Sequence, residues 1–284
     1  MISGKTKIFA IMGDPVEHSL SPTMHNAAFR ELGLNYLYVA FRVSSSSLRN
    51  GVESIRALNI KGVNITIPHK IAVLNYLDEL DEFAKMIGAV NTIKNECGRL
   101  RGFNTDGKGA IRALKEKVKD IRDASVLLLG AGGAARSIAF SLAKSGAELS
   151  ISNRTFSKAE DLADSIERKI KTKVKRIPLK QEKLKKVIAE ADILINATSV
   201  GMYPKENETL VTSDMMHSDL VVKDIVYKPV KTRLLREAEK AKADTIDGLS
   251  MLVHQGAESF EIWTGQSAPI DVMRRATKEA LESG

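Results

Sequence analysis

Gly130-Ala131-Gly132-Gly133-Ala134-Ala135-Arg136 is the stretch that decides how half of this chain is expected to fold. The apolar segment Val126–Leu129 precedes it directly and the amphipathic segment Ala134–Ser145 follows, so it should join a strand to a helix. It fits the pattern G-x-G-x-x-A. The first glycine permits a tight turn, the second lets the backbone approach a pyrophosphate, and the small Ala135 lets helix and strand pack closely. Free amides at the helix start would face the phosphates.

A tight turn without a ligand would also use glycines, so the surroundings of the loop decide between the two interpretations. A second expected strand, Glu148–Ser152, ends about 20 residues further on, as the dinucleotide-binding pattern requires. It leads into Asn153-Arg154-Thr155, where an NAD-binding protein would carry an acidic residue. The guanidinium of Arg154 instead suits a 2′-phosphate, and Lys158 lies one helical turn beyond. A surface arginine in a loop is the alternative, but the pattern favours NADP.

Short apolar segments alternate with amphipathic ones along the whole chain, which is typical of α/β folds with mostly parallel sheets. In the first part, the expected strands are Lys7–Met12, Tyr36–Phe41, Gly62–Ile67 and a hairpin of Val90–Lys94 and Arg99–Phe103, with helices starting near Ser21 and Ser47. In the second part, the remaining expected strands are Val174–Ile177, Ile193–Asn196 and Leu220–Ile225, and the remaining helices Ser157–Lys169, Glu182–Ala189 and Thr232–Lys242. A helix from about Asp106 to Lys119 should bridge the two parts, and one or two helices from Gly248 onward should return to the first.

Length and composition indicate a globular protein of two domains. The chain has 284 residues, of which 43% are apolar and 27% charged. No apolar run could span a membrane, the first residues lack the apolar stretch of a signal peptide, and the single cysteine, Cys97, cannot form an internal disulfide. A cytoplasmic protein without a membrane partner is therefore expected. The net charge of +8 fits a lysine-rich surface or attraction of anions, while scattered lysines and 5% aromatic residues argue against a nucleic-acid partner.

Four polar clusters precede the glycine loop, mostly at strand ends or turns, where functional residues concentrate. They are Gly13–Pro22, Lys61–Lys70, Gly88–Thr92 and Asn104–Gly107. In the first cluster, Ser19 and Ser21 stand just before a helix and could cap it or bind a carboxylate. In the second, Lys70 could be a solvated lysine, although the start of a helix is a poor place for one. In the fourth, Asp106 could be an ordinary N-cap.

In this order, the four clusters and the glycine loop resemble those of the shikimate dehydrogenase family. Further matching motifs are Asn196–Met202, Asp224–Tyr227 and Asp247–Gly256, so the resemblance spans the chain from Gly13 to Trp263. It implies an α/β protein with an N-terminal substrate-binding and catalytic domain (residues 1–106 plus 246–284), a Rossmann-type, doubly wound NADP-binding domain (residues 107–245), and a cleft between them. It also implies a reaction of aromatic amino acid biosynthesis, the reversible reduction of 3-dehydroshikimate to shikimate with NADPH.

The resemblance implies roles for individual residues as well. The catalytic pair would be Lys70 and Asp106. The substrate carboxylate would be bound by Ser19 and Ser21 with Tyr227 nearby, and the ring hydroxyls by Thr66, Asn91, Asp106 and Gln255, beside Lys70. The pyrophosphate would be cradled by Gly130, Ala131, Gly132, Gly133 and Ala134, and the adenosine phosphate end held by Asn153, Arg154, Thr155 and Lys158. The nicotinamide side would be lined by Thr198, Ser199, Met202, Ile225, Gly248 and Met251.

The implied catalytic residues suit the chemistry. An ammonium within hydrogen-bond reach of a developing alkoxide can stabilise it and lose a proton, and a carboxylate can fix that ammonium. No metal-ligand cluster is expected. The alternatives are a quinate or dual quinate/shikimate dehydrogenase, which often uses NAD, a methylenetetrahydrofolate dehydrogenase, which lacks this set of motifs, and a non-catalytic dinucleotide sensor, which would need no Lys70–Asp106 pair. The oligomeric state stays open, with a homodimer among the alternatives.

Overall fold

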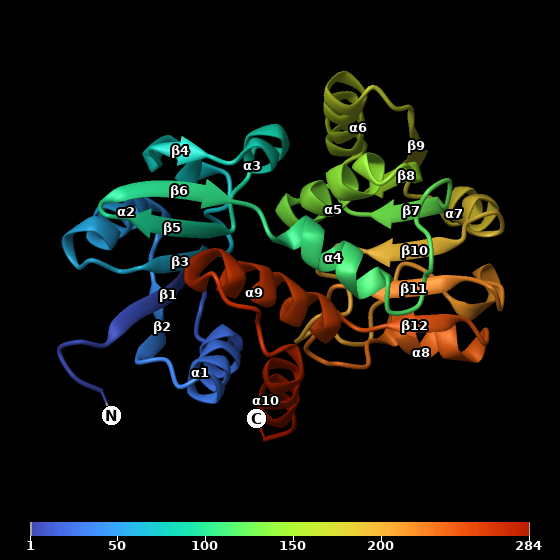
Figure 1. Cartoon of the computed structure of the whole chain (residues 1–284). Coiled ribbons are helices and arrows are strands. Elements are labelled where there is room, and N and C mark those ends of the chain that lie inside the picture. Colours follow the sequence, from blue (N-terminus) through green and yellow to red (C-terminus); the bar gives the residue numbers. More distant parts are fainter. Residues whose placement is uncertain (1, 284) are drawn as a thin grey trace. The chain divides into compact units, whose positions relative to one another are not determined.

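The computed structural model describes residues 2–283 (Figure 1). The chain forms two compact units, the first made of residues up to Asp106 together with those from Val253 onward, and the second of Gly107–Leu252. Each unit contains a six-stranded sheet. The expected division placed the second boundary at residue 246, before a helix begins. In the structure the two units divide within that helix, α9 (Gly248–Thr264).

The sheet of the second unit has the order β9-β8-β7-β10-β11-β12, and all neighbouring strands are parallel. Its strands are β7 (Ser125–Leu129), β8 (Glu148–Asn153), β9 (Val174–Pro178), β10 (Ile193–Asn196), β11 (Val221–Asp224) and β12 (Asp244–Ile246). Numbered within the unit, this is the order 3-2-1-4-5-6 of the doubly wound dinucleotide-binding fold. The glycine loop follows β7, where the strand order reverses and such folds bind their ligands. The predicted Rossmann-type fold is confirmed.

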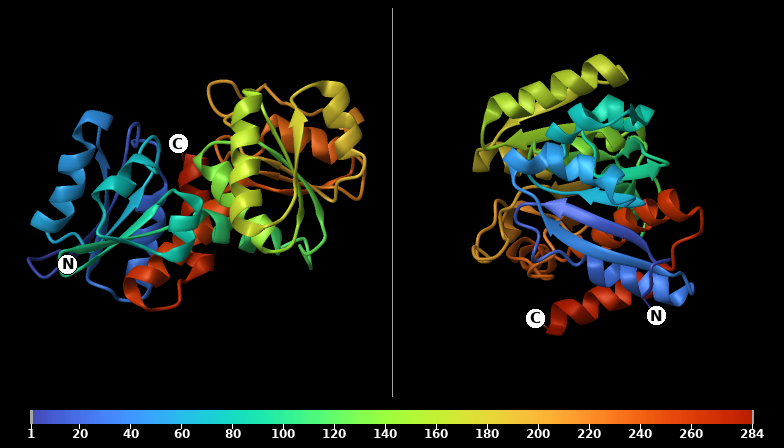
Figure 2. Two further views of the ribbon diagram at one scale, coloured as in Figure 1. Left: turned by 90° about the horizontal axis from the view of Figure 1, so that it is seen from above. Right: turned by 90° about the vertical axis from the view of Figure 1, so that its left-hand side faces the viewer.

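Helices cover both faces of this sheet (Figure 2). They are α4 (Asp106–Leu114), α5 (Gly133–Lys144), α6 (Phe156–Ile170), α7 (Gln181–Ile188) and α8 (Arg233–Lys240), with a short 3₁₀ helix, η3 (Ser213–Met215). Successive side chains of a strand point to opposite faces, so Leu127 and Leu129 of β7 share one face and pack with residues of α7 and α8. The central strands are rich in Val, Ile and Leu because both of their faces are buried.

The first unit contains a mixed sheet in the order β2-β1-β3-β5-β6-β4. Its strands are β1 (Lys7–Gly13), β2 (Tyr36–Arg42), β3 (Gly62–Ile65), β4 (Glu79–Leu80), β5 (Thr92–Glu96) and β6 (Arg99–Phe103). Strands β1, β2 and β3 are parallel, and β5 is antiparallel to both β3 and β6. The ends of β1, β3 and β6 therefore lie at the same edge of the sheet as the start of β5. All four polar clusters of the sequence fall at this edge.

The helices of the first unit are α1 (Ser21–Glu31), α2 (Leu48–Ala57), α3 (Glu82–Ile87), most of α9, and α10 (Ile270–Ser283), with short 3₁₀ helices η1 (Ser45–Ser47) and η2 (Ala72–Tyr76). An aromatic core that includes Phe9, Phe29 and Trp263 joins the sheet to α1 and α9. The indole of Trp263 donates to the Ile93 carbonyl oxygen at 2.9 Å. Its ring lies so close to Gly62 that a larger side chain there would clash, which fixes α9 on the sheet.

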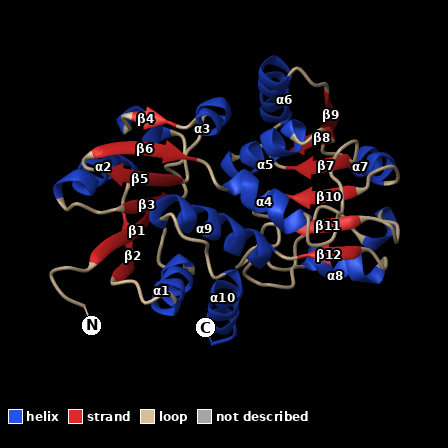
Figure 3. Ribbon diagram, viewed as in Figure 1, coloured by secondary structure: helices blue, strands red, loops and turns tan. Residues whose placement is uncertain are grey.

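Some predicted elements differ from the structure (Figure 3). The helix expected to reach Lys119 ends at Leu114, and hydrogen-bonded turns follow it. The strand expected to reach Ile67 ends at Ile65, near Pro68, which has no amide for the ladder. Most other predicted ends of helices and strands agree with the structure within one or two residues. Strand β4, helix α3 and strand β12 were not predicted, and the two strands have only two and three residues, too few to show an alternating pattern.

Candidate active site

The residues predicted to bind the substrate lie, with one exception, in the first unit. Ser19 and Ser21 follow β1, Thr66 and Lys70 follow β3, Asn91 precedes β5, Asp106 follows β6, and Gln255 lies on α9. The strand register explains how distant positions meet, because Asn64 pairs with Thr92 and Thr92 pairs with Phe103. The exception is Tyr227, which follows β11 in the second unit. Burial raises the pKa of its phenol.

Lys70 and Asp106 form an ion pair in the first unit. The Lys70 Nζ donates to Asp106 Oδ2 at 2.6 Å, and the two side chains are 17% and 7% exposed. An ammonium has three donors, and no other hydrogen-bond partner of this one lies among residues 2–283. Lys70 is therefore not a freely solvated lysine. Asp106 is the first residue of α4, and its carboxylate is held by side chains from other parts of the sheet edge.

Asn91 is at the centre of this group and is only 2% exposed. Its Nδ2 lies 2.9 Å from Asp106 Oδ1, 2.9 Å from Thr105 Oγ1 and 3.3 Å from Gln255 Oε1. Its Oδ1 accepts from the Thr105 amide at 2.8 Å and from the Thr92 hydroxyl at 3.0 Å. One amide side chain thus fixes the carboxylate of the ion pair and contacts α9. Donors and acceptors fixed in this way need no reorganisation when a ligand binds.

The two serines after β1 differ in their surroundings. Ser19 is half-buried, and its Oγ accepts from the Ser21 amide at 3.3 Å. Ser21 is only 4% exposed. The N-cap of α1 is Leu20, which offers no side-chain acceptor. Neither serine occupies the N-cap position, although the Ser19 hydroxyl accepts from the first amide of α1.

Buried polar residues that were given no role from the sequence lie beneath Asn91. Asn64 donates its Nδ2 toward the Asn91 carbonyl oxygen at 3.1 Å and Ser259 Oγ at 3.1 Å. Its Oδ1 accepts from the Tyr38 hydroxyl at 2.7 Å. Asn64 lies in a cluster that the sequence pointed out, but Tyr38 stands in an apolar strand and resembles a core residue. Ser259 could have been found, because it is four residues after Gln255 on the same helix face.

The glycine loop of the second unit has the geometry of a phosphate-binding turn. Gly130 has φ +116°, and a methyl group there would lie 2.7 Å from the Ala197 carbonyl oxygen, so only glycine fits. Gly132 is the N-cap of α5, and no atom lies within 4 Å of where its side chain would begin. No side chain caps α5. This open space in front of a helix start fits a pyrophosphate group.

The end of β8 presents basic side chains to solvent. Arg154 and Lys158 are exposed, and neither forms an ion pair with any residue of the described chain. Asn153 donates its Nδ2 to the Thr155 carbonyl oxygen at 2.8 Å, which stabilises the turn from which Arg154 projects. A free guanidinium at a strand end without a carboxylate fits a 2′-phosphate.

The residues predicted for the nicotinamide side follow β10 and β11 or begin α9. They are Thr198, Ser199, Met202, Ile225, Gly248 and Met251. Buried Asp224, to which the sequence analysis gave no role, holds the two loops together. Its carboxylate accepts from Asn196 Nδ2 at 2.9 Å, the Val226 amide at 3.0 Å and the Thr232 hydroxyl at 2.7 Å. Asn196 in turn accepts from the Thr198 hydroxyl at 2.7 Å. Burial raises the pKa of the Asp224 carboxyl to about 6.

Comparison with known proteins identifies the family. Models described as "Shikimate dehydrogenase substrate binding domain" and "Shikimate / quinate 5-dehydrogenase" match residues 11–93 and 112–251, and a model of the "Shikimate 5'-dehydrogenase C-terminal domain" matches residues 248–278. The chain belongs to the shikimate dehydrogenase family. A relative from Methanopyrus kandleri, a shikimate dehydrogenase (NADP(+)), is 51% identical over 283 residues, which cover 99% of this chain and 98% of the relative.

Solved structures of the shikimate dehydrogenase family agree with this assignment. The crystal structure of a shikimate dehydrogenase in complex with NADP+ is 47% identical, with a TM-score of 0.93 and coverage of 99% of this chain and 98% of that one. A Listeria monocytogenes shikimate 5-dehydrogenase in complex with shikimate and NAD is 44% identical, with a TM-score of 0.91 and coverage of 96% and 97%. The predicted family and fold class are confirmed, whereas the roles of single residues stay predictions.

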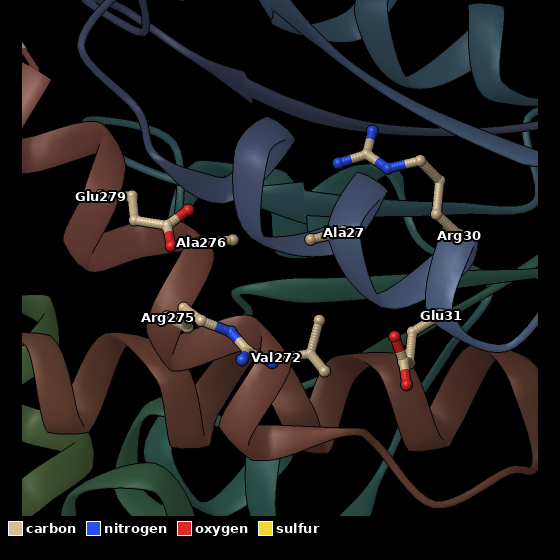
Figure 4. A pocket seen from close by; sticks show the side chains of 7 residues that line it. All are labelled: Ala27, Arg30, Glu31, Val272, Arg275, Ala276 and Glu279. Atoms are coloured by element: carbon tan, nitrogen blue, oxygen red, sulfur yellow. The ribbon is translucent and has the colours of Figure 1, made fainter.

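A hollow in the first unit lies apart from the shikimate dehydrogenase motifs, between α1 and α10 (Figure 4). Its volume is about 380 Å³, and its lining residues are Ala27, Arg30, Glu31, Val272, Arg275, Ala276 and Glu279. Two basic and two acidic side chains surround a small apolar floor. None of these four forms an ion pair with another residue between 2 and 283.

Two searches of the described residues gave negative results. No group of three or more His, Cys, Asp or Glu side chains in residues 2–283 could hold a metal ion. Within the same range, the helices are all too short or too polar to cross a membrane.

Proposed function

We propose that this chain is an NADP(H)-dependent shikimate dehydrogenase, which reversibly reduces 3-dehydroshikimate to shikimate. The observation that carries this proposal is the arrangement of Lys70, Asp106 and Asn91. A buried carboxylate fixes the ammonium at 2.6 Å, and an amide fixes that carboxylate at 2.9 Å. The ammonium keeps donors for an oxygen on which negative charge develops. A dinucleotide sensor would have no use for such a pair.

In the proposed reaction, Lys70 stabilises the oxygen of the carbonyl that is reduced and donates a proton to it. A bound nicotinamide supplies the hydride. In the reverse direction Lys70 accepts the proton from the alcohol. Asp106 holds the ammonium in place and accepts a hydrogen bond from a ring hydroxyl. Because both side chains are largely withdrawn from water, their attraction is stronger than that of a surface pair.

The polar groups around this pair suit a polyhydroxylated acid. We assign the ring hydroxyls to Thr66, Asn91, Asp106 and Gln255, since amides both donate and accept hydrogen bonds. We assign the carboxylate to the hydroxyls of Ser19 and Ser21, with Tyr227. The net charge of +8 would favour the encounter with an anionic substrate.

We assign NADP to the second unit. The pyrophosphate would lie at Gly130–Ala134, where the open space before α5 meets its free amides. Asn153, Arg154, Thr155 and Lys158 would hold the adenosine end, with the guanidinium on the 2′-phosphate. The nicotinamide would lie near the loops that Asp224 joins, with Thr198, Ser199, Met202, Ile225, Gly248 and Met251 around it.

The proposed reaction places the protein in aromatic amino acid biosynthesis, in the cytoplasm, without a nucleic-acid or membrane partner. The exposed free thiol of Cys97 supports a reducing compartment. We further propose a homodimer that forms through the α1/α10 hollow. Its two arginines and two glutamates offer both signs of charge to a second copy related by a two-fold axis. Sedimentation of the wild type and of Arg275→Glu tests this, and a monomeric wild type would refute it.

The test of the proposed function is a spectrophotometric assay of NADP+ reduction by the purified chain. We expect shikimate to be oxidised with NADP+ more efficiently than with NAD+, and quinate to be a poorer substrate than shikimate. A higher kcat/KM for quinate would identify a quinate dehydrogenase instead. No reduction with either acid would overturn the enzymatic proposal and favour the sensor.

A further inference from the structure

A continuous set of buried hydrogen bonds leads from β2 to the proposed catalytic pair. It starts at the Tyr38 phenol, passes to Asn64, and continues to the Asn91 carbonyl oxygen. From Asn91 it reaches Asp106 and then Lys70. Every one of these residues belongs to the first unit. Tyr38 is thus connected to the catalytic pair through Asn64 and Asn91.

Tyr38 is the first residue of this set and contacts Asn64. It is 1% exposed, and its hydroxyl donates to Asn64 Oδ1 at 2.7 Å. Its ring is stacked on His25 with a centroid distance of 4.5 Å and an interplanar angle of 12°. The ring therefore has little freedom, and the position of its hydroxyl is set by packing. Removal of this hydroxyl would leave the buried Oδ1 of Asn64 without the hydrogen bond from Tyr38, which is energetically unfavourable.

Ser259 is the link between the sheet edge and α9. It is fully buried, and its Oγ lies 2.8 Å from Thr92 Oγ1, 3.2 Å from Thr105 Oγ1 and 3.1 Å from Asn64 Nδ2. It also donates to the Gln255 carbonyl oxygen at 3.1 Å, one helical turn earlier. The hydroxyl therefore sets the position of the helix turn that carries Gln255. Thr92 and Thr105 both contact Asn91, so the same hydroxyl supports the central amide from below.

We propose that Tyr38 and Ser259 are positioning residues of this enzyme, which hold Asn64 and, through it, align Asn91 and Gln255 with the Lys70–Asp106 pair. Neither residue touches the substrate in this proposal. The inference rests on the proposed function, since it concerns alignment for the shikimate reaction. Buried polar networks of this kind hold a unique geometry when all members are satisfied and lose it when one is removed.

The test uses Tyr38→Phe and Ser259→Ala in the full chain, each of which removes one hydroxyl and little volume. We expect each to lower kcat/KM for shikimate by about two- to tenfold, the effect of one buried neutral hydrogen bond. The loss should appear in both kcat and KM for shikimate, while KM for NADP+ stays unchanged. The double variant should lose less than the product of the two single effects, because both act through Asn64.

Two variants of the same unit are matched controls. Tyr36→Phe removes a hydroxyl from the same strand, where the ring packs against Phe9 and Phe29. Thr277→Val removes a buried helical hydroxyl that donates to the Met273 carbonyl oxygen at 2.6 Å, as Ser259 does to Gln255. Both should keep the shikimate kinetics of the wild type. Thermal unfolding, followed by the fluorescence of Trp263, shows how much each hydroxyl contributes to stability alone.

Three results would overturn the inference. The first is that Tyr38→Phe and Ser259→Ala have the shikimate kinetics of their controls, whatever their thermal stability. The second is an equal loss in all four variants, since a structural role alone would produce it. The third is that the wild type does not oxidise shikimate, which overturns the proposed function as well. Should Tyr38→Phe fail to fold, Ser259→Ala and Thr277→Val decide the outcome.

Discussion

The two units of the chain hold their candidate site residues in opposite ways. In the first unit, Lys70, Asp106 and Asn91 are bonded to one another through their side chains and largely withdrawn from solvent. In the second unit, Gly132 and Arg154 are exposed, and the described part of the chain gives Arg154 no ionic partner. The first site is assembled before a ligand arrives, whereas the second consists of backbone geometry and open side chains.

This difference follows from what each site has to recognise. A ring acid differs from its analogues by single hydroxyls, and only donors and acceptors at fixed points distinguish them. A phosphate has several equivalent oxygens, so helix amides and a long guanidinium can bind it without a prior network. We therefore expect substitutions in the first site to change the rate, and substitutions in the second to change cofactor affinity.

The largest effect should come from Lys70→Met, which keeps a long apolar stem and removes the ammonium. We expect kcat to fall by about 10²–10⁴, the usual contribution of a general acid–base group. KM for NADP+ should change little, since the residues proposed to bind its phosphates belong to the other unit. Asp106→Asn should give a comparable fall, and the double variant should be far from additive, because paired groups act as a unit.

The control for Lys70→Met is Lys94→Met, a substitution in the same unit of a lysine whose one ion pair within residues 2–283 is with Glu96 on β5. It should leave kcat unchanged. Steady-state kinetics with shikimate and NADP+ measure both variants. If Lys70→Met kept a near-normal kcat and only raised KM for shikimate, the lysine would be a substrate anchor. The expectation that the first site sets the rate and the second sets cofactor affinity would then be wrong.

The second prediction concerns the other unit. Arg154→Ala should raise KM for NADP+ by about tenfold to hundredfold, the effect of losing a hydrogen bond to a charged group. KM for NAD+ should change far less, because NAD+ has no 2′-phosphate. Arg168→Ala removes an exposed arginine from the same unit and should affect neither cofactor. Equal losses for NADP+ and NAD+ in Arg154→Ala would refute the 2′-phosphate assignment.

The contrast between the units also explains which parts were predictable from the sequence. The glycine loop could be recognised because its function depends on local backbone geometry, and Gly130 alone requires a conformation that only glycine adopts. The parallel sheet around it follows from the alternation of apolar and amphipathic segments. β12 was missed because its three residues gain their role only beside β11.

The buried network of the first unit could not be predicted in the same way. Tyr38 and Asn64 are brought together by strand pairing, and Ser259 reaches Asn64 from a helix near the other end of the chain. In the sequence, a tyrosine within an apolar strand indicates a core position. The polar clusters pointed to the sheet edge at which the candidate site residues meet, but hydrogen bonds between distant residues depend on tertiary packing.

Acidification should change the stability of the two units in opposite directions, and the larger change is expected from His25 in the first unit. Burial among aromatic rings lowers the pKa of this imidazole to about 3, and neither ring nitrogen has a hydrogen-bond partner in residues 2–283. The unfolded chain takes up a proton below about pH 6.5, whereas the folded chain does not, so stability falls as the pH falls. Between pH 8 and pH 5 this residue should lower the free energy of unfolding by about 2 kcal/mol.

Replacement by a ring that cannot titrate isolates this contribution. His25→Phe fits an aromatic environment and should lose less stability on acidification than the wild type. Denaturant unfolding at pH 8 and pH 5, followed by Trp263 fluorescence, reports on the first unit. His18→Gln, which changes an exposed histidine, should keep the pH dependence of the wild type. The same pH dependence in His25→Phe would show that the imidazole is protonated in the folded state.

The smallest effect, of opposite sign, is expected from Asp224 in the second unit. Burial raises the pKa of its carboxyl to about 6, so the folded chain binds this proton more tightly than the unfolded chain does. The stabilisation is complete below the unfolded pKa and is lost as the pH rises through about 6. Between pH 5 and pH 8 the lost stabilisation amounts to about 1 kcal/mol in the free energy of unfolding.

Asp224→Asn removes the titration and can keep the three hydrogen bonds, because an amide oxygen can accept from Asn196 and Val226 while the Thr232 hydroxyl turns to accept from the amide nitrogen. Calorimetric unfolding at the two pH values should therefore show that the variant gains less stability at pH 5, relative to pH 8, than the exposed control Asp219→Asn does. An identical pH dependence of the two variants would mean that Asp224 is ionised throughout this range, and that the loops after β10 and β11 are held by a charge rather than by a neutral acid.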